Sequence, residues 1–469
     1  MADVTRRQFL KQMGGAIAPA ALAASGLLSI PRVADALTKD DASPRKPNII
    51  FILADDLGYG DLGCYGQQKV QTPHIDRLAK EGVRFTDFYA GSSVCAPSRC
   101  CLMTGMHTGH ARIRGNNPPI PLTPLQREDV TVAKVLKQAG YSTGIIGKWG
   151  LGETGNSGAP NKQGFDYFFG YLKHGQAHNY YPLRLWRNEE AVKIPAGTYS
   201  HDLFTQEALD FVRREKDKPF FLYLAYTIPH ANNEVKGNGM QVPSDYPCSD
   251  KPWSETERDF AAMITRMDRD IGRLIALLQD LGLDDNTIVF FAGDNGPHHE
   301  GGHDAEMFNS NGPLRGGKSD PYDGGIRIPM IARWPGNIRA GRESDFVGAF
   351  WDVLPTAAEI AGTKPPATVD GISLLPLLLG RRQKEHDYLY WEFYPYWESR
   401  DILSQAARVG NWKAVRQSQE KPIELYDLKT DIAEQYDVAA QHPDVVKRIE
   451  GVLKTAHGHS DYWPPKTGN

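Results

Sequence analysis

The stretch Asn48-Ile49-Ile50-Phe51-Ile52-Leu53-Ala54-Asp55-Asp56 joins a continuous apolar run to two adjacent carboxylates. An uninterrupted apolar run of this length, rich in β-branched residues, is typical of a strand that is buried on both faces. Strands of this kind belong to parallel sheets, which helices cover on both sides. Because the two aspartates follow the run directly, we expect them at the carboxyl end of the strand.

Further apolar runs predict more strands of the same sheet. They occupy residues 142–146, 220–226, 287–292 and 326–333. Amphipathic stretches that predict helices lie at residues 75–80, 130–138, 203–213, 260–281 and 352–361. The alternation of strands and helices indicates an α/β fold, with a mostly parallel central sheet covered by helices on both faces.

A change of pattern near residue 385 predicts a second, smaller unit. Short aromatic-rich strands follow this point, and a final helix is expected at residues 445–455. A chain of 469 residues also exceeds what one hydrophobic core usually spans. We therefore expect a main domain (47–384) and a C-terminal α+β subdomain with a short antiparallel sheet (385–469).

The charge of the chain argues against two classes of partner. Lys and Arg together number 53 against 57 Asp and Glu, and the formal net charge is −4. The sequence contains no basic tract that would hold nucleic acid or an anionic membrane surface. We therefore expect neither as a partner.

Two pairs of oxygen-bearing side chains follow predicted strands. Asp55 and Asp56 end the first strand, and Asp294 and Asn295 come just after the strand at residues 287–292. In open α/β sheets ligands bind outside the carboxyl ends of the strands, so the two pairs can converge on one point. Oxygen donors of this kind suit calcium or magnesium better than zinc. Either pair alone is also typical of a strand-ending turn, but the two together favour a metal site.

The segment Cys95-Ala96-Pro97-Ser98-Arg99 resembles the C-x-P-S-R signature of the formylglycine-dependent sulfatases, in which a modifying enzyme oxidises the cysteine to formylglycine. Other stretches resemble this family in the same order along the chain: Asp55-Asp56, Gly147-Lys148-Trp149, Pro229-His230, Met267-Asp268, Gly293-Asp294-Asn295-Gly296, Gly317-Lys318, Asp323-Gly324-Gly325 and Glu424-Leu425-Tyr426-Asp427-Leu428. The resemblance covers nearly all of the chain after residue 46. It implies the alkaline-phosphatase-like fold, with residues 47–384 as the catalytic domain.

The same resemblance implies a reaction, the hydrolysis of sulfate monoesters with release of inorganic sulfate. In this family the hydrated aldehyde provides two hydroxyls, of which one attacks the sulfur of the ester and the other later expels sulfate. A formylglycine-generating enzyme would make the aldehyde from Cys95. A small buried thiol is the alternative interpretation of this residue.

Two groups of site residues are implied by the resemblance. The metal group would hold calcium and consists of Asp55, Asp56, Asp294, Asn295 and the modified Cys95. In the catalytic group, Arg99 would steady the hydrated aldehyde. Lys148 and Lys318 would bind the sulfate oxygens, and His230 would protonate the leaving alkoxide.

One position departs from the family pattern. Family members commonly have Lys-x-His, with the histidine assisting the elimination of sulfate, but this chain has Lys148-Trp149-Gly150. His178, in a loop that also contains His174, is our candidate for the missing base. The alternatives are slow turnover, or a protein that binds its ligand without completing the cycle.

The stretch His299-Glu300-Gly301-Gly302-His303 matches the zinc motif H-E-x-x-H. That motif binds zinc only on a helix, which brings both histidines to one face. Two glycines inside it and Pro297 before it argue against a helix. We therefore predict a loop beside the metal pair, with His298, His299 and Glu300 as substrate contacts.

The N-terminal segment resembles a twin-arginine export signal. Arg6 and Arg7 precede a mildly apolar run, and Ala34-Asp35-Ala36 is typical of a cleavage site. We expect a signal peptide at residues 1–36 and a linker at residues 37–46. With the export machinery as partner, the mature protein would be periplasmic or secreted and would have no membrane span.

The substrate expected from the sequence is a sulfated small sugar or oligosaccharide. Loops rich in aromatic residues, such as Tyr181 and Trp253, can stack on sugar rings, although most aromatic side chains are core residues. A phosphate or phosphonate ester hydrolase of the same superfamily is the main alternative. A binder of sulfated glycans without turnover is the other.

Overall fold

Strand β1 (Asn48–Asp55) lies between two parallel neighbours, which explains its apolar sequence. It pairs with β8 (Phe220–Pro229) on one side and with β9 (Thr287–Gly293) on the other. Every residue of the three strands is buried. The prediction that the first apolar run forms a buried parallel strand is confirmed.

In the computed structural model of the protein, residues 45–116, 123–394 and 403–463 are described. The expected signal peptide (1–36) and residues 37–44 of the expected linker lie outside the described residues. Within the described ranges, no helix is both long enough and apolar enough to cross a membrane.

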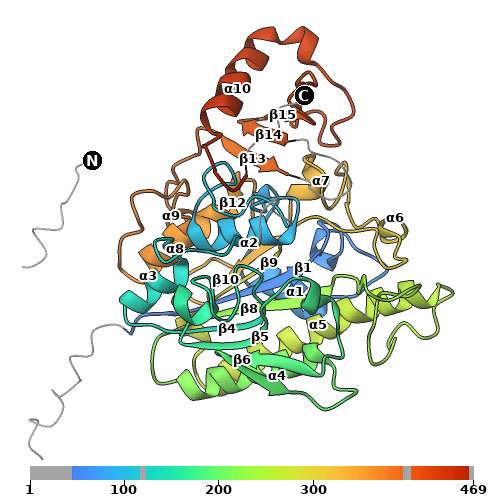
Figure 1. Ribbon diagram of the computed structural model, residues 1–469, viewed down its shortest axis with the longest axis vertical. Helices are drawn as coiled ribbons and strands as arrows, with labels where there is room; N and C mark the ends of the chain where they lie inside the picture. The colour runs from blue at the N-terminus through green and yellow to red at the C-terminus, as the bar shows by residue number, and fades with distance from the viewer. Residues whose placement is uncertain (1–44, 117–122, 395–402, 464–469) are drawn as a thin grey trace, which may run out of the picture. The chain divides into compact units, whose positions relative to one another are not determined.

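The large sheet of the described chain has ten strands in the order β11-β2-β10-β9-β1-β8-β4-β5-β6-β7 (Figure 1). Its remaining members are β2 (Val83–Phe85), β4 (Ser142–Lys148), β5 (Tyr167–Tyr171), β6 (Arg184–Arg187), β7 (Glu190–Lys193), β10 (Met330–Arg333) and β11 (Arg342–Ser344). The central strands are parallel, whereas β10, β6 and β7 run antiparallel to neighbours toward the two edges. The sheet is therefore mostly parallel, as the sequence predicts.

The prediction of a strand at residues 326–333 is only partly correct. Residues Asp323–Ile326 form the short helix α7, and the strand β10 covers only Met330–Arg333. It also pairs antiparallel with β9 and β2. The apolar run is continuous in sequence because a helix end, a linker and a strand are buried one after another.

Helices cover both faces of the large sheet (Figure 1). Alternate residues of β1 divide between two hydrophobic cores, with Ile49, Phe51 and Leu53 in one and Ile50, Ile52 and Ala54 in the other. The first core includes residues of α2 (Cys95–Thr104), α3 (Val132–Gln138) and α8 (Val353–Ile360). The second includes residues of α1 (Pro73–Glu81), α4 (Ser200–Glu215) and α5 (Glu255–Asp280). Helix α2 was not predicted from the sequence.

A separate antiparallel sheet confirms the expected C-terminal α+β unit (Figure 1). It consists of β13 (Leu389–Phe393), β14 (Ser404–Val409), β15 (Trp412–Arg416) and β16 (Glu424–Asp427), with α10 (Pro443–Thr455) packed against it in a third core. Shorter elements are β3 (Phe88–Tyr89), β12 (Gly348–Ala349), α6 (Ala305–Phe308) and α9 (Leu375–Leu378). The domain boundary between residues 384 and 385 stays a prediction.

A buried ion network joins the antiparallel sheet to the loop and helix that follow Lys318. The ammonium of Lys413 in β15 lies 2.8 Å from Asp323 Oδ1 and 3.2 Å from Glu434 Oε1. All three side chains are inaccessible to solvent. Removing the lysine would take the cation from Glu434 and leave Asp323 with its pair to Arg327, at 3.3 Å.

We expect Lys413→Ala to lower the free energy of unfolding by about 3–5 kcal/mol, because Asp323 and Glu434 would lose their common cation. Guanidinium denaturation followed by circular dichroism measures this loss. The exposed Lys421 provides a matched control, since Lys421→Ala removes the same side chain without a buried partner. Equal free energies of unfolding for the two variants would contradict a stabilising role of the buried Lys413 network.

Candidate active site

The two predicted metal pairs meet at the carboxyl ends of β1 and β9. Ala54 lies opposite Gly293 in the parallel register, so the residues that follow each strand emerge side by side. The amide of Asp56 donates to Asp294 Oδ1 at 3.0 Å, and Asn295 Nδ2 donates to Asp56 Oδ1 at 2.7 Å. Asp56 has a φ of 61°, a left-handed conformation that aspartate tolerates better than most residues. The predicted convergence of the two pairs is confirmed.

Helix α2 brings the signature residues to the same point. It begins at Cys95, whose sulfur lies within 4.8 Å of carboxylate oxygens of Asp55 and Asp294. Arg99, one turn later, donates from Nη2 to Asp294 Oδ2 at 2.8 Å and lies 3.3 Å from Asp55 Oδ1. The helix could have been found in the sequence, because a proline in the first turn and a glycine after the last turn are typical helix boundaries.

Lys148 approaches the carboxylates from the end of β4. Its side chain is buried, and Nζ donates to Asp55 Oδ2 at 2.7 Å. The preceding Gly147 has a φ of 109°, and a Cβ there would lie 1.8 Å from the carbonyl oxygen of Ala225 in β8. Only glycine allows this close approach of the two strands, which fixes where the lysine enters the site.

Lys318 and His230 lie beside Asp56. Lys318 Nζ donates to Asp56 Oδ2 at 2.9 Å and to Glu300 Oε2 at 3.0 Å, and lies 3.1 Å from His230 Nε2. The other ring nitrogen of His230 lies 2.6 Å from the carbonyl oxygen of Ala231. That contact fixes the proton on Nδ1, so Nε2 is the nitrogen that faces the site.

The remaining predicted residues lie around this cluster in different ways. The ring of His178 stacks on that of His230, with centroids 4.3 Å apart. His298 is buried, with Nε2 3.2 Å from the carbonyl oxygen of Pro229. His299 is exposed and, with Glu300 and Lys318, lines a cavity of about 560 Å³ that opens beside the site.

The H-E-x-x-H stretch is a loop without helical residues, as the sequence predicts. His303 is buried away from His299, stacks on Phe260 at 3.7 Å and lies 2.7 Å from Glu257 Oε2. The two histidines therefore do not share a face, and the stretch is not a zinc site.

Burial and neighbouring charges shift the titration of the acidic site residues. Burial alone would raise the pKa of Asp55, but the cations Lys148 and Arg99 outweigh it and hold that pKa well below its usual range. Burial and then the charge of Asp55 raise the pKa of Asp294 to about 7. The carboxylates therefore repel one another in a site that excludes water.

Burial and neighbouring charges also shift the pKa values of the basic and sulfur groups of the site. Burial lowers the pKa of Lys148, but Asp55 and Cys95 outweigh it and raise the pKa. Burial, and then the charge of Lys318, lower the pKa of His230 well below its usual range. Burial raises the pKa of the Cys95 thiol, with smaller contributions from Lys148 and the carboxylates. The lysine is therefore charged, whereas the imidazole and the thiol are neutral.

The donor set fits a hard divalent cation. When ionised, four carboxylates face three cations in the cluster: Asp55, Asp56, Asp294 and Glu300 against Arg99, Lys148 and Lys318. This arrangement would repel an anionic ligand unless a cation were added. In addition, Asp55 Oδ1 and Asn295 Oδ1 are buried without a hydrogen bond. Oxygen atoms of this kind are ligands that calcium accepts.

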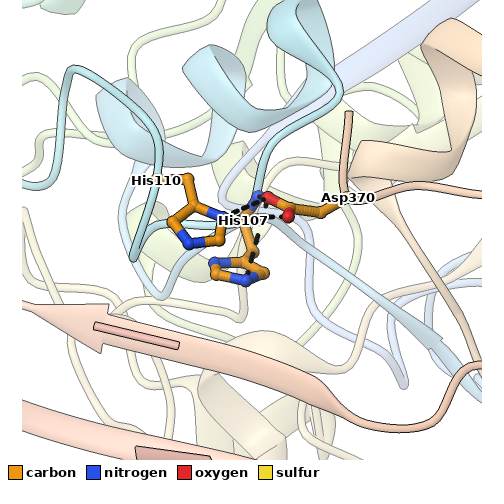
Figure 2. Close-up of side chains that lie close together, drawn as sticks. All are labelled: His107, His110 and Asp370. Atoms are coloured by element: carbon orange, nitrogen blue, oxygen red, sulfur yellow. Dashed lines mark hydrogen bonds and ion pairs between the residues drawn. The ribbon is translucent and has the colours of Figure 1, made fainter. Parts of the chain in front are cut away.

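A second cluster, of His107, His110 and Asp370, was not singled out in the sequence (Figure 2). His110 Nδ1 lies 2.9 Å from Asp370 Oδ1, and the amide of His107 donates to Asp370 Oδ2 at 3.0 Å. His107 Nδ1 accepts from the amide of Gly109 at 3.2 Å, which fixes the ring proton on Nε2. Because Nε2 is the nitrogen directed at Asp370, a metal ion there would find no lone pair. The cluster connects the loop after α2 to Asp370.

Comparisons with known proteins agree with this geometry. A family profile described as Sulfatase matches residues 47–363, and one described as N-sulphoglucosamine sulphohydrolase, C-terminal, matches residues 318–457. The chain is 34% identical to arylsulfatase A of Homo sapiens over 483 residues, which covers 88% of each protein.

The chain is also similar to a bacterial sulfatase and to a protein of known crystal structure. The chain is 31% identical to N-acetylgalactosamine-6-O-sulfatase of Bacteroides thetaiotaomicron over 511 residues, covering 88% of this chain and 93% of that protein. The crystal structure of Ps i-CgsB in complex with k-i-k-neocarrahexaose matches with a TM-score of 0.79 and 30% identity, over 90% of this chain and 96% of the other. The chain therefore belongs to the type I sulfatases of the alkaline-phosphatase-like superfamily and is a sulfuric ester hydrolase.

Proposed function

We propose that the protein hydrolyses sulfate monoesters of carbohydrates, with a formylglycine made from Cys95 as nucleophile and calcium as the metal. The observation that carries this proposal is the position of the Cys95 sulfur within 4.8 Å of Asp55 and Asp294 oxygens. A group built on this residue would lie beside a metal held by the same two carboxylates, with which the guanidinium of Arg99 also pairs.

The thiol itself is a poor candidate for the nucleophile. Thiolates attack and thiols do not, and burial raises the pKa of Cys95. The hydrated aldehyde of formylglycine supplies an oxygen nucleophile together with a second hydroxyl for the later release of sulfate. Because Cys95 is 2% exposed, the modifying enzyme would act before the chain folds. Export in the folded state through the expected twin-arginine signal is compatible with that order, and would give a periplasmic or secreted enzyme.

Calcium would be held by Asp55, Asp56, Asp294 and Asn295, and when bound it would stabilise negative charge on the reacting oxygens. Lys148 pairs with Asp55 and Lys318 pairs with Asp56, and both ammonium groups would bind sulfate oxygens. The two ammonium groups, with Arg99, would offset the charge that develops as the ester bond breaks.

His230 is the residue suited to protonate the leaving oxygen. Its Nδ1 keeps its proton on the carbonyl of Ala231, so the neutral ring must first take a second proton on Nε2, which it can then deliver to the leaving oxygen. Asp56 Oδ2 and Glu300 Oε2 lie 3.4 and 3.8 Å from Nε2 and would stabilise the charged ring. Glu300 would thereby act on His230 and Lys318 together. The exposed His299 would contact the sugar, whereas both ring nitrogens of the buried His298 are bonded to the backbone.

Two observations support a carbohydrate as the alcohol part of the ester. The similar proteins include an N-acetylgalactosamine-6-O-sulfatase and a structure with a bound neocarrahexaose. The cavity beside Lys318 is lined by hydrogen-bonding side chains, among them Asn309, Asn311 and Glu306. A cavity of this composition suits the hydroxyl groups of a sugar.

The rival reaction is the hydrolysis of phosphate or phosphonate esters. Both anions would bind the same cations, so a paired assay with matched sulfate and phosphate esters separates the two. We expect the higher kcat/KM for the sulfate ester. A higher value for the phosphate ester would overturn the proposed reaction.

The modification has a direct test. We expect the peptide containing Cys95, from a host with the modifying enzyme, to have a mass about 18 Da below that of the thiol form, or the mass of its hydrate, which ordinary thiol oxidation cannot produce. The other buried cysteine peptides, such as that of Cys248, should keep the thiol mass. An unmodified Cys95 would remove the formylglycine mechanism.

Substitutions of Cys95 test its role in turnover. Cys95→Ala should abolish sulfate release, and Cys95→Ser should retain a sulfate ester on the serine, which lacks the second hydroxyl. Peptide mass spectrometry and sulfate release measure the two effects. Cys248→Ala is the matched control and should turn over normally, whereas full activity of Cys95→Ala would contradict the mechanism.

The metal assignment predicts a calcium-dependent stability. Calcium should raise the melting temperature of the wild type, because it binds the folded state only. Asp294→Asn should lose calcium affinity by more than the roughly 10–100-fold typical of changes outside the ligand set. Calorimetric titration measures the loss, with exposed Asp280→Asn as control. Unchanged calcium affinity in Asp294→Asn would exclude the site.

A further inference from the structure

A histidine outside the predicted site set fills the space beside Gly150. Gly150 has a φ of 78°, and a Cβ built on it would lie 2.2 Å from His174 Cε1, 2.7 Å from Nδ1 and 2.9 Å from Nε2. The edge of the imidazole that carries both nitrogens therefore occupies the volume in which a side chain at position 150 would begin. Position 150 is the one where the family commonly has its histidine.

The sheet brings the two positions together. β4 and β5 are parallel neighbours, with Lys148 opposite Tyr171, and the pairing continues because the amide of Gly150 donates to the carbonyl of Leu172 at 3.1 Å. Residues that follow the two strands therefore emerge at the same edge of the sheet. His174 reaches across this edge to the backbone of its neighbour.

One nitrogen of the His174 ring, Nδ1, is buried in the protein and makes no hydrogen bond. Burial, and then the cations Lys148 and Arg99, lower the pKa of His174 well below its usual range, whereas Asp55 acts in the opposite sense. Burial and these two site cations favour the neutral, proton-accepting form of the imidazole.

We propose that His174 replaces the histidine missing at position 150 and accepts the proton when sulfate is eliminated. The inference rests on the proposed function. In this step the imidazole takes the proton of the remaining hydroxyl on the formylglycine carbon, and the O–H electron pair becomes the C=O bond. The bond from that carbon to the sulfate oxygen breaks, and its electron pair leaves with sulfate.

His178 is the competing candidate and has a different position. Its ring stacks on His230, and its pKa is lowered to about 4 by burial and then by Lys148. It therefore packs against the residue that would serve the leaving alkoxide. The three atoms nearest to a Cβ built on Gly150 all belong to His174.

The first experiment compares His174→Ala with His178→Ala, both carrying formylglycine and calcium. We expect His174→Ala to slow steady-state sulfate release by roughly 10²–10⁴-fold, the usual contribution of a general base, while the Cys95 peptide retains the mass of one SO₃ group. Added imidazole should restore part of the rate. His178→Ala should lower the rate without retained sulfate, and exposed His459→Ala should match the wild type.

Several results would overturn the inference. Wild-type turnover in His174→Ala excludes the role, as does a slow variant with neither retained sulfate nor imidazole rescue. If His174→Ala does not fold, His174→Gln keeps the volume of the side chain and must show the same retained sulfate. A wild type that carries formylglycine and calcium but cleaves no sulfate ester would refute the proposed function, and the inference with it.

A second experiment tests whether the two positions share one space. Gly150→His should lower the melting temperature, because the new Cβ would collide with the His174 ring. Combining it with His174→Gly removes the collision, so the double variant should regain stability relative to Gly150→His and release sulfate at least about tenfold faster than His174→Gly. Additive losses of stability and rate would show that the positions are independent, and would contradict the replacement.

Discussion

The parallel pairing of β1 with β8 and β9 is the constraint on which the rest of the structure depends. It places the ends of three buried strands at one edge, and each strand is followed at once by polar residues. Two of those segments supply the carboxylates and the amide, and the third supplies His230. A shift of one residue in this register would turn the buried side chains to the opposite face and separate the site residues.

The site that results is a buried set of nearly balanced charges. Arg99 reaches the carboxylates from helix α2 and Lys148 from strand β4, two elements that are far from the aspartates in the sequence. Such pairs cost desolvation energy and are poor devices for stability alone. Their arrangement would suit the proposed function, in which the site holds both a divalent cation and a sulfate ester.

The parts of the fold that the sequence predicted are those whose burial leaves a clear apolar pattern. Strands β1, β8 and β9 were predicted well because they are buried on both faces, so their sequences are apolar throughout. The same signal failed at residues 326–333, where a helix end and a strand are both buried. Helix α2 was missed because all of its residues are buried, which leaves no amphipathic periodicity to read.

The sequence by itself determined which chemical groups gather at the candidate site, because motifs along the chain identified the two oxygen-bearing pairs, the cysteine signature, Lys148, Lys318 and His230. It also showed that position 150 lacks the usual histidine. Only the tertiary structure decided what lies in that gap. The ring of His174 fills it by reaching across two paired strands, a contact set by three-dimensional packing that no spacing along the chain encodes.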